Sequence, residues 1–478
     1  MSFDSVTFWI FFAVAWAIWR FLPFGMAKTA TVGTSLLFYG WWNPWFIGLI
    51  VFSAVVDYQA GGKIHSSDEA RTRRAWLLVS LTANLGLLAL FKYGPFIVGN
   101  LEPVAESMGY AATWDLSWWI VPVGISFYTF QTLSYSIDIY RRQLAPAQSF
   151  RDFLLYVSFF PQLVAGPIVR ARSLIPQFRA RRALSSKLVS AGFYYIILGL
   201  FLKIVIADNL APIVNYSFDK ELLLSMSPAN VWLSVIYFAA QIFSDFAGYS
   251  YIAIGLAYLM GLHFPENFRW PYISSGLSEF WTRWHVSLSQ WLRDYLYISM
   301  GGNRRGTAWT FVFLMTTMLL GGLWHGAAWT FVAWGAFHGL GLCVERGLRG
   351  GGSRELSSGP PKGAGDFLIR LIRIALVMVF VLTSWVFFRA TDFEMVAMLL
   401  ERMYVAPFGE SFGFDDLLHA RHALLLIPIV GLHLGQLAHE WYGVRANNYA
   451  RAFVAALFLF FLTIVQRDAP SEFIYFQF

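Results

Sequence analysis

Two histidines stand in unusual segments of an otherwise apolar sequence, and His325 is the first of them to consider. It lies in GGLWHGAAW, between glycines, and follows an uncharged run that begins at Thr307. In an apolar environment a neutral histidine can act as a general base toward a hydroxyl or a thiol. A buried histidine that hydrogen-bonds a backbone carbonyl fits the same pattern. The flanking glycines allow either backbone or a ligand to approach closely.

The second histidine, His285, lies in EFWTRWHVSLSQWLRDY, where aromatic, charged and hydroxyl side chains are interleaved. On a continuous helix Trp281, His285 and Ser289 share one face at i, i+4 and i+8, and Arg293 extends that row. Such a face either lines a cavity or lies along the inner membrane surface. The residues expected to line or support the site are Trp281, Arg283, Ser289, Asp294, Asn303 and Trp324, and His338 is expected to serve packing or support.

A third candidate lies in the aromatic segment FIYFQF at residues 473–478, within the C-terminal stretch 467–478. A disordered tail would be less apolar, so we expect this segment to dock against the protein. One interpretation is an interfacial aromatic anchor. The other is that Tyr475 presents a phenol as a nucleophile on the outer side of a membrane.

Composition decides the class of protein that must position these groups. The chain has 478 residues, of which 57% are hydrophobic and 13% charged, whereas soluble domains are roughly 25% charged. A soluble globular enzyme, a disordered regulator and a secreted disulfide scaffold are therefore excluded. The single cysteine, Cys343, can form no intrachain disulfide and supplies no cysteine-rich metal site, and we expect no metal.

The apolar segments predict an all-α polytopic membrane protein that forms one domain over residues 1–478. We expect roughly eleven transmembrane helices, together with a re-entrant or interfacial segment at 153–168 that is broken by prolines and glycine. We expect the core catalytic region at residues 241–339, because polar residues persist there. It opens with Gln241, Ser244 and Asp245, and an acid within an apolar helix should face the interior and have a partner.

Charge sets the expected orientation. The net charge of +7 comes from basic residues between apolar segments, which the positive-inside rule explains better than binding to nucleic acid. The rule predicts an outer location for both termini and for the acidic segment 389–420, which we expect to be a loop. Six cations follow the segment 153–168, and they either mark the inner face or hold anionic lipid or the phosphates of a cofactor. They are Arg170, Arg172, Arg179, Arg181, Arg182 and Lys187.

Several long segments, taken in order, resemble the membrane-bound O-acyltransferase (MBOAT) family, in its bacterial alginate O-acetyltransferase-like branch. They are FSDFAGYSYIAIGLAYLMG (243–261), FPENFRWPYIS (264–274), EFWTRWHVSLSQWLRDYLYISMGGNRRG (279–306), GGLWHGAAWTFVAWGAFHG (321–339) and the terminal FIYFQF.

The resemblance implies a ring of helices around a central acyl-transfer tunnel, with His325 as the catalytic histidine and His285 as the second histidine of the site. It also implies acetyl-CoA as a cytosolic thioester donor, with the acetyl group passed across the bacterial inner membrane. Tyr475 would then act as an acyl relay to a periplasmic SGNH-type acetyltransferase partner, which would acetylate an exported polysaccharide.

Other functions remain open from the sequence. Within the same chemistry, the alternative is D-alanyl transfer to teichoic acid. Outside it, the alternatives are a non-enzymatic polysaccharide exporter and a structural scaffold for a polymer synthase. The sequence shows no internal repeat of the kind that many transporters carry. Alginate, cellulose, peptidoglycan or another exopolysaccharide would each fit as the acceptor.

Overall fold

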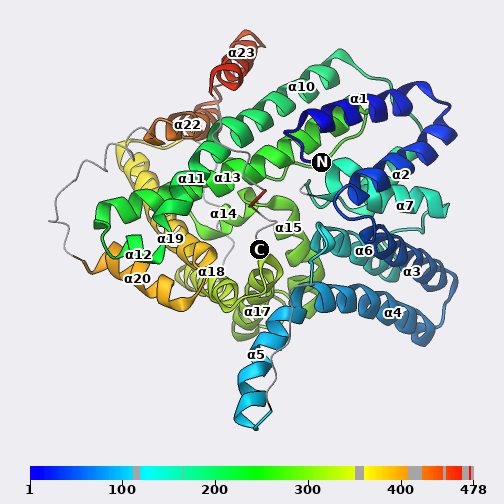
Figure 1. The fold of residues 1–478 in the computed structure, drawn as a ribbon, viewed down its shortest axis with the longest axis horizontal. Coiled ribbons are helices and arrows are strands. Elements are labelled where there is room, and N and C mark those ends of the chain that lie inside the picture. The colour runs from blue at the N-terminus through cyan, green and yellow to red at the C-terminus, as the bar shows by residue number, and fades with distance from the viewer. Residues whose placement is uncertain are drawn as a thin grey trace. The chain divides into compact units, whose positions relative to one another are not determined.

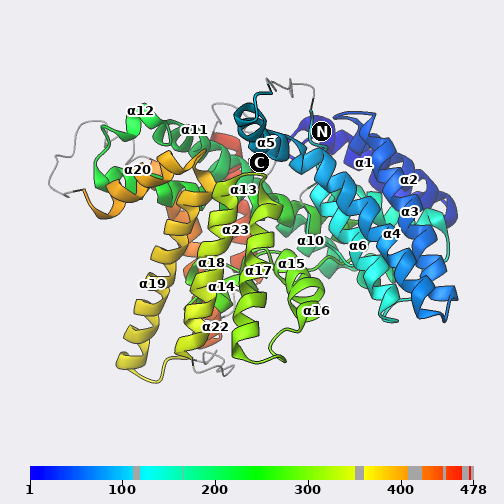
Figure 2. The same ribbon diagram turned by 90° about the horizontal axis from the view of Figure 1, so that it is seen from below.

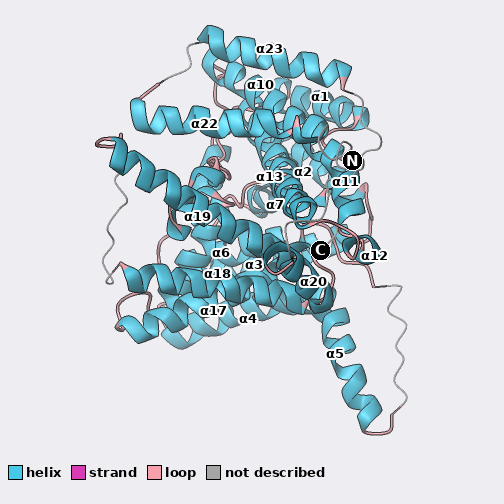
Figure 3. Cartoon of the chain, turned by 90° about the vertical axis from the view of Figure 1, so that its left-hand side faces the viewer, coloured by secondary structure: helices cyan, strands magenta, loops and turns pink. Residues whose placement is uncertain are grey.

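The computed structural model describes residues 1–110, 119–164, 166–349, 360–406, 422–444, 448–465 and 473–474. Within these ranges the chain consists of helices and loops, without strands (Figure 3). Figure 1 shows the order of the helices along the chain. By its internal contacts the chain divides into two compact units, Met1–Ile196 with Ile252–Pro265, and Ile197–Tyr251 with Glu266–Phe478. The all-α expectation is confirmed, whereas the prediction of one membrane domain stays a prediction.

Six helical segments in the described part are long and apolar enough to cross a membrane, which makes this a polytopic membrane protein. The predicted number of roughly eleven is not reached by this criterion, and the surrounding tunnel stays a prediction. Two shorter apolar helices, Val6–Phe21 and Tyr449–Ile464, accompany the six. The six are Phe46–Ser66, Ala70–Ser107, Ser186–Ser217, Pro228–Leu259, Thr307–His325 and Ala364–Arg389.

The first unit is built from helices of the N-terminal part of the chain. Its elements are α1 (Val6–Phe21), α2 (Phe24–Gly40), α3 (Phe46–Ser66), α4 (Ala70–Leu88), the π-helical turn η1 (Ala89–Tyr93), α5 (Gly94–Ser107), α6 (Ile125–Tyr140), α7 (Phe150–Ser158), α8 (Phe160–Leu163), α9 (Ala171–Leu174), the 3₁₀ turn η2 (Ile175–Phe178) and the first part of α10 (Ser186–Leu200). Glu102 and Glu106 lie within α5.

The segment predicted to be re-entrant forms two short helices, α7 and α8, of 9 and 4 residues. At ~1.5 Å per residue neither could span the ~30 Å hydrocarbon core. Their side chains from Phe153 to Leu163 are buried. Of the cations that follow, Arg181 donates to the carbonyls of Arg20 and Leu22 at 2.8 and 2.5 Å. It therefore closes the end of α1, where a cation is favourable.

A buried carboxylate in the first unit is held by neutral partners. Asp57 of α3 accepts hydrogen bonds from Asn84 at 2.8 Å and Ser136 at 3.0 Å, and a further one from Ser80. These side chains come from α4 and α6. The cluster joins three neighbouring helices through polar contacts, as expected for an acid within an apolar helix.

The second unit carries the histidines. Its elements are the π-helical turn η3 (Phe201–Ala207), α11 (Asp208–Ser217), α12 (Lys220–Leu223), the 3₁₀ turn η4 (Pro271–Ile273), α14 (Leu277–Arg283), α15 (Val286–Trp291), the π-helical turn η5 (Leu292–Tyr297), α16 (Ile298–Met300), α17 (Thr307–His325), α18 (Trp329–Leu348), α19 (Ala364–Arg389), α20 (Phe393–Tyr404), α22 (Leu426–Tyr442) and α23 (Asn448–Ile464). The long helix α13 (Pro228–Leu259) contributes its residues up to Tyr251.

Helices α17 and α18 run side by side, with α19 next to α18 (Figure 2). Glycines permit this close packing. A Cβ atom on Gly322 would lie 2.2 Å from the carbonyl oxygen of Phe331, and one on Gly335 would lie 2.3 Å from that of Met318. Small residues let helix backbones approach closely in membranes, so these glycines serve helix packing near the turn that follows His325.

The acidic segment 389–420 is not a plain loop. Its first part forms the amphipathic helix α20, which begins where the Asp392 side chain accepts from the backbone N–H of Met395 at 2.9 Å. The apolar side chains of α20 that are buried are Met395, Val396, Leu399 and Met403. The sequence expectation missed α20 because the acidic residues of this helix are interspersed with the apolar residues that form its buried face.

Candidate active site

His325 is the last residue of α17, at the turn into α18, and only 3% of it is exposed. Aromatic rings surround it. Its imidazole centroid lies 5.0 Å from the ring of Trp334, 5.1 Å from that of Trp324 and 5.4 Å from that of Phe388. The uncharged run from Thr307 forms the helix that carries the imidazole into this apolar environment.

His285 does not lie within a continuous helix, which corrects the expected shared face of Trp281, His285 and Ser289. Helix α14 ends at Arg283, and α15 begins at Val286. His285 lies between them in the left-handed region, with φ 42° and ψ 53°, a conformation that costs energy for a residue with a Cβ atom. The break turns the imidazole into the protein, where the residue is fully buried.

The strained backbone of His285 is held by Asn267. This residue lies in the segment 264–274, but no feature of the sequence assigned it to the site. Its side-chain oxygen lies 3.1 Å from His285 Nδ1 and accepts from the Ser287 hydroxyl at 2.8 Å and the Ser287 N–H at 3.2 Å. Its amide donates to the Ser250 hydroxyl at 3.1 Å, and its own carbonyl accepts from the N–H of Val286 at 2.9 Å.

This network assigns the tautomer of His285. Because the Asn267 oxygen is an acceptor, Nδ1 of His285 carries the proton and donates, and Nε2 holds the lone pair. Burial lowers the pKa of His285 to about 3. The imidazole is therefore neutral at physiological pH, with Nε2 as its basic nitrogen.

The fold brings the two histidines together. Their ring centroids lie 6.4 Å apart, and the Trp324 ring contacts both, at 5.1 Å from His325 and 5.9 Å from His285. Trp324 was expected to support the site. It is buried, at 3% exposure, and contacts both imidazoles. Two imidazoles in one aromatic environment could move a proton between a hydroxyl and a leaving group.

Two aromatic residues of α19 complete these surroundings and were not predicted. Phe388 packs edge-on against both His325 and Trp334, at 5.4 and 5.3 Å. Trp385 lies 4.9 Å from Trp284 and 5.4 Å from Phe388. In the sequence these residues belong to a predominantly apolar segment, 367–388, which gives no sign of which of its faces meets the histidines.

His338 lies on α18 and is buried next to the site rather than in its centre. Its Nε2 is 3.0 Å from the hydroxyl of Ser384, and its ring lies 4.8 Å from that of Trp334 and 5.1 Å from that of Trp281. Trp334 therefore separates His338 from His325. This position agrees with the expected packing or supporting role of His338.

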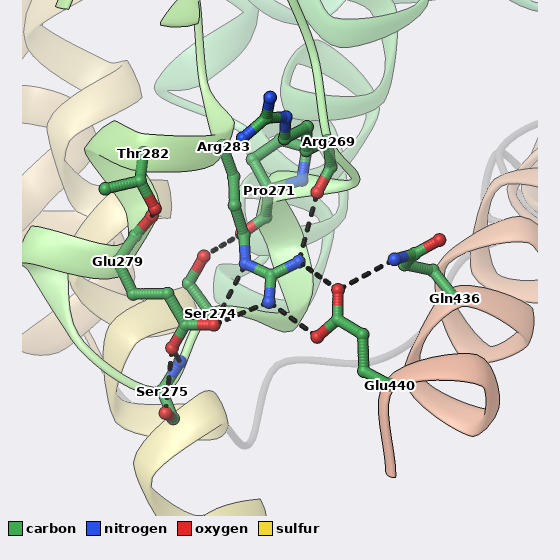
Figure 4. A network of polar contacts seen from close by, with 9 residues as sticks. All are labelled: Arg269, Pro271, Ser274, Ser275, Glu279, Thr282, Arg283, Gln436 and Glu440. Carbon is green, nitrogen blue, oxygen red and sulfur yellow. Dashed lines mark hydrogen bonds and ion pairs between the residues drawn. The ribbon is translucent and has the colours of Figure 1, made fainter. Parts of the chain in front are cut away.

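Arg283 is the centre of an ion-pair network rather than part of the histidine environment (Figure 4). It donates to Glu279 at 2.7 Å and to both carboxylate oxygens of Glu440 on α22, at 2.8 and 2.6 Å. It also donates to the carbonyl of Arg269 at 3.2 Å, while Gln436 donates to Glu440 at 2.7 Å. The fork of the guanidinium thus ties α14 to the preceding loop and to α22.

The other residues that were expected to line or support the site lie at different distances from it. Trp281 packs against Trp334 and His338, and the Ser289 hydroxyl donates to the carbonyl of Trp284 at 3.2 Å. Asp294 pairs with the exposed Arg293 at 2.7 Å, and Asn303 is exposed in the loop before α17. Trp281 thus adjoins the site, whereas Asp294 and Asn303 lie in more exposed surroundings.

Of the C-terminal aromatic segment, the structure describes Phe473 and Ile474, which are buried at 1% and 2% exposure. Tyr475 lies outside the described residues. The expectation that this segment docks is confirmed for the two residues that precede the tyrosine. Among the described residues, no three His, Cys, Asp or Glu side chains gather in a way that could hold a metal ion.

The described residues define a class of protein: a multi-pass, all-α membrane protein with two histidines in a buried aromatic site. Comparison with known sequences then gives the family. A sequence profile described as MBOAT, membrane-bound O-acyltransferase family, matches residues 144–352.

Three relatives show how far the similarity extends. A probable alginate O-acetylase AlgI of Pseudomonas putida is 36% identical over 93% of both chains. A peptidoglycan O-acetyltransferase of Helicobacter pylori is 34% identical over 79% of this chain and 73% of its own length. A teichoic acid D-alanyltransferase of Streptococcus thermophilus is 32% identical over 46% of this chain and 56% of its own length. The chain belongs to the membrane-bound O-acyltransferase family and is an O-acyltransferase.

Proposed function

We propose that this protein transfers an acetyl group from a cytosolic thioester, acetyl-CoA, for the O-acetylation of an exported bacterial polysaccharide. The observation that carries the proposal is the convergence of His285 and His325 within 6.4 Å in one buried aromatic site. The relatives named for alginate and peptidoglycan O-acetylation match most of the chain, which supports acetyl as the group and a polysaccharide as the acceptor.

The first chemical step is acyl transfer from sulfur to oxygen. A hydroxyl oxygen attacks the thioester carbonyl, the carbon–sulfur bond breaks, and an oxygen ester forms. The hydroxyl proton passes to an imidazole and then to the departing thiolate, so the products are the ester and free CoA thiol. His325 is the proposed base, and His285 orients the reactants or moves the proton through its Nε2 lone pair.

The attacking hydroxyl in this proposal is the phenol of Tyr475, which would carry the acetyl group as an aryl ester. A periplasmic SGNH-type acetyltransferase would then move the acetyl group to a sugar hydroxyl and return the free phenol. An aryl ester suits a relay because phenoxide is a better leaving group than a sugar alkoxide. The docking of Phe473 and Ile474, which precede Tyr475, supports this route.

The orientation follows from the same scheme. Basic loops would face the cytosol of a bacterial inner membrane and attract the phosphates of the donor. Both termini would face the periplasm. Membrane lipid would surround the apolar helices, and the polysaccharide would meet the enzyme through its periplasmic partner.

The test is ester-linked acetate on the envelope and secreted polysaccharides of a deletion strain. The strain is complemented with wild type, His325→Ala or Tyr475→Phe at matched membrane levels. We expect acetate to return only with the wild type. Loss with His325→Ala alone would remove Tyr475 from the mechanism, and full acetate with both variants would contradict the catalytic proposal.

Identification of the transferred group tests the nearest alternative, D-alanyl transfer to teichoic acid. The relative with that name matches less than half of this chain, whereas the O-acetylation relatives match most of it. Mass spectrometry of base-released acids would therefore show acetate, and D-alanine in its place would overturn the proposal. If the protein were an exporter or a scaffold, the amount of acetate or D-alanine released by base would not depend on the histidines.

A further inference from the structure

A buried ion cluster connects α13 with the π-helical turn η3 and helix α11, outside the histidine site. Lys203 Nζ is 2.8 Å from a carboxylate oxygen of Asp208 and 2.9 Å from Oδ1 of Asp245. The side chains are 0%, 0% and 3% exposed, respectively. The sequence prediction that Asp245 faces the interior and has a partner is confirmed. One ammonium with two carboxylates leaves this buried cluster with a formal charge of −1 when all three groups are ionised.

The second carboxylate oxygen of Asp245 binds the backbone of Ile474, near the C-terminus. Its Oδ2 accepts a hydrogen bond from the backbone N–H of Ile474 at 2.7 Å. The two residues are far apart in the sequence, and Ile474 is 2% exposed. Hydrogen bonds to ionised acceptors are roughly twice as strong as those between neutral groups, and here the negative cluster increases the attraction for the N–H dipole. In Figure 1, residues 473–474 are the short dark-red segment near α13.

The anchored segment lies one aromatic ring away from the histidine site. Phe246, the neighbour of Asp245, lies 4.7 Å from the His285 ring and 5.8 Å from the Phe473 ring. Phe473 also packs against Tyr249, one turn along α13, at 4.5 Å. Helix α13 therefore presents Asp245 for the backbone of the segment and two rings for its side chain, next to His285.

We propose that Asp245, held in place by Lys203, is a positioning residue that anchors the C-terminal segment beside the histidine site. Tyr475 follows Ile474 directly, so the group that holds Ile474 limits the reach of the phenol. The anchoring itself stands on the contacts of Phe473 and Ile474. Its catalytic consequence, delivery of the Tyr475 hydroxyl, rests on the proposed function.

In this proposal the ion cluster both joins two helices and binds the C-terminal segment. The pair of Lys203 with Asp208 already neutralises the ammonium, and it would be retained without Asp245. What Asp245 adds is an acceptor aimed at a backbone N–H from the other end of the chain. A backbone contact also explains how the anchor acts independently of the side chain at position 474.

The anchoring is tested by thiol accessibility in the full-length protein in detergent. In a Cys343→Ser background, Ile474→Cys supplies one thiol, and its rate of reaction with a water-soluble maleimide is measured. We expect slow labelling, and a rate about tenfold higher when Asp245→Ala is added, as expected from the loss of one charge-assisted hydrogen bond. Asp245→Glu, which can restore the carboxylate, should recover part of the protection.

Asp57→Asn is the matched control, because it also removes a buried carboxylate from an apolar helix but lies in the other unit. Its labelling rate should equal that of the parent. Equal rates in the Asp245→Ala and control proteins would overturn the proposal. If Asp245→Ala does not fold, Ile474→Pro in a Phe473→Cys protein removes the N–H donor and leaves the ion cluster intact, and its labelling is compared with that of Phe473→Cys alone. Unchanged labelling at Phe473→Cys would then overturn the proposal.

A second readout separates the anchoring from the proposed function. Purified wild type and Asp245→Ala, both with natural Ile474, receive acetyl-CoA with a labelled acetyl group. The label on the C-terminal peptide and the affinity for the donor are then measured. We expect the peptide label to fall at least tenfold while donor affinity is unchanged, whereas a misfolded site would lose both. Labelled peptide at the wild-type level in Asp245→Ala would overturn the positioning role.

The two hypotheses fail in different ways. If the wild type carries no label but the thiol at position 474 becomes accessible in Asp245→Ala, the anchoring stands and the acyl relay is wrong. If the wild type is labelled and the thiol is equally accessible in all variants, the relay stands and the anchoring is wrong.

Discussion

The imidazole rings of His285 and His325 lie 6.4 Å apart, centroid to centroid, although they belong to different helical segments. Each reaches this point in its own way. His325 ends an apolar helix, whereas His285 occupies a left-handed break between two short helices. The site thus combines a histidine at the end of a 19-residue helix with one on a strained turn, and Asn267 holds the turn.

Replacement of His325 should affect the acyl-transfer step itself. We expect His325→Gln to lower the rate of acetyl transfer at least ~10²-fold, the usual contribution of a general base, with little change in membrane level. The exposed His439→Gln on α22 is the control and should retain the wild-type rate. The measurement is CoA release from acetyl-CoA by purified protein. A His325→Gln enzyme with the wild-type rate would show that the imidazole is structural.

Asn267 should control the protonation of His285. Asn267→Leu removes the acceptor for His285 Nδ1 and for Ser287, so we expect activity to fall roughly 10–100-fold through loss of the oriented tautomer. Asn267→Asp keeps an acceptor and adds a negative charge, which raises the pKa of the imidazole. The acid limb of its pH–rate profile should therefore move to higher pH than in the wild type. Identical profiles would contradict this role.

Acid stability should depend on His285. Burial lowers the pKa of His285 to about 3, while an unfolded histidine has a pKa of ~6.5. Between these values the unfolded chain binds the proton and the folded chain does not, so stability falls as the pH drops from 6.5 toward 3. Above pH 6.5 this contribution is fully present. We expect His285→Gln to show a smaller loss of apparent melting temperature between pH 7 and pH 5 than the wild type.

Any acid sensitivity that His285→Gln leaves unchanged would belong to other groups. His439→Gln again serves as the control, because His439 is exposed on α22. An acid sensitivity of His285→Gln equal to that of the control would contradict the prediction.

The Arg283 network should stabilise the loop that precedes His285. Arg283→Ala leaves Glu279 and Glu440 without their shared partner, and we expect a loss of roughly 1–3 kcal/mol, given the partial exposure of both acids. Arg283→Lys should recover only part of it, because an ammonium cannot reproduce the two-pronged contact. Arg269→Ala breaks an exposed pair with Glu266 and should cost ~0–1 kcal/mol. Comparable thermal shifts for Arg283→Ala and Arg269→Ala in detergent would contradict this assignment.

Gly322 should tolerate no larger residue, because α18 packs directly against it. The Cβ atom of Gly322→Ala would meet the Phe331 carbonyl oxygen at 2.2 Å, and we expect a loss of ~1–3 kcal/mol from overpacking. Gly365→Ala in α19 is the matched control, since nothing lies within 4 Å of its added methyl group. That change should be neutral or stabilising by up to ~1 kcal/mol. Apparent melting temperatures of the two variants that fall equally would show that the α17–α18 contact is not tight.

Much of the architecture could be predicted before any coordinates were known. The surplus of apolar side chains required lipid around helices, because no water is available in a membrane to satisfy exposed backbone groups. The uncharged runs before His325 and around Asp245 predicted helices, and both were found. The same cost of burying a charge predicted that Asp245 has a partner, and Lys203 is that partner.

The errors arose where local periodicity was extended too far. The repeat of Trp281, His285 and Ser289 fitted a helix, yet the chain breaks at His285, because the contacts of Asn267 outweigh the local preference for a continuous helix. Likewise, the acids of 389–420 predicted a loop, whereas the buried apolar face of α20 decided for a helix.

By itself, the sequence determined the class of the protein, the helical segments and the two histidines, because apolar transfer energy and residue chemistry are local properties that add along a chain. The tertiary structure alone decided that Asn267 assigns the tautomer of His285, that Trp385 and Phe388 of α19 complete the site, and that Asp245 holds Ile474. These are contacts between segments far apart in the chain. Their geometry depends on how whole helices pack, which no single segment specifies.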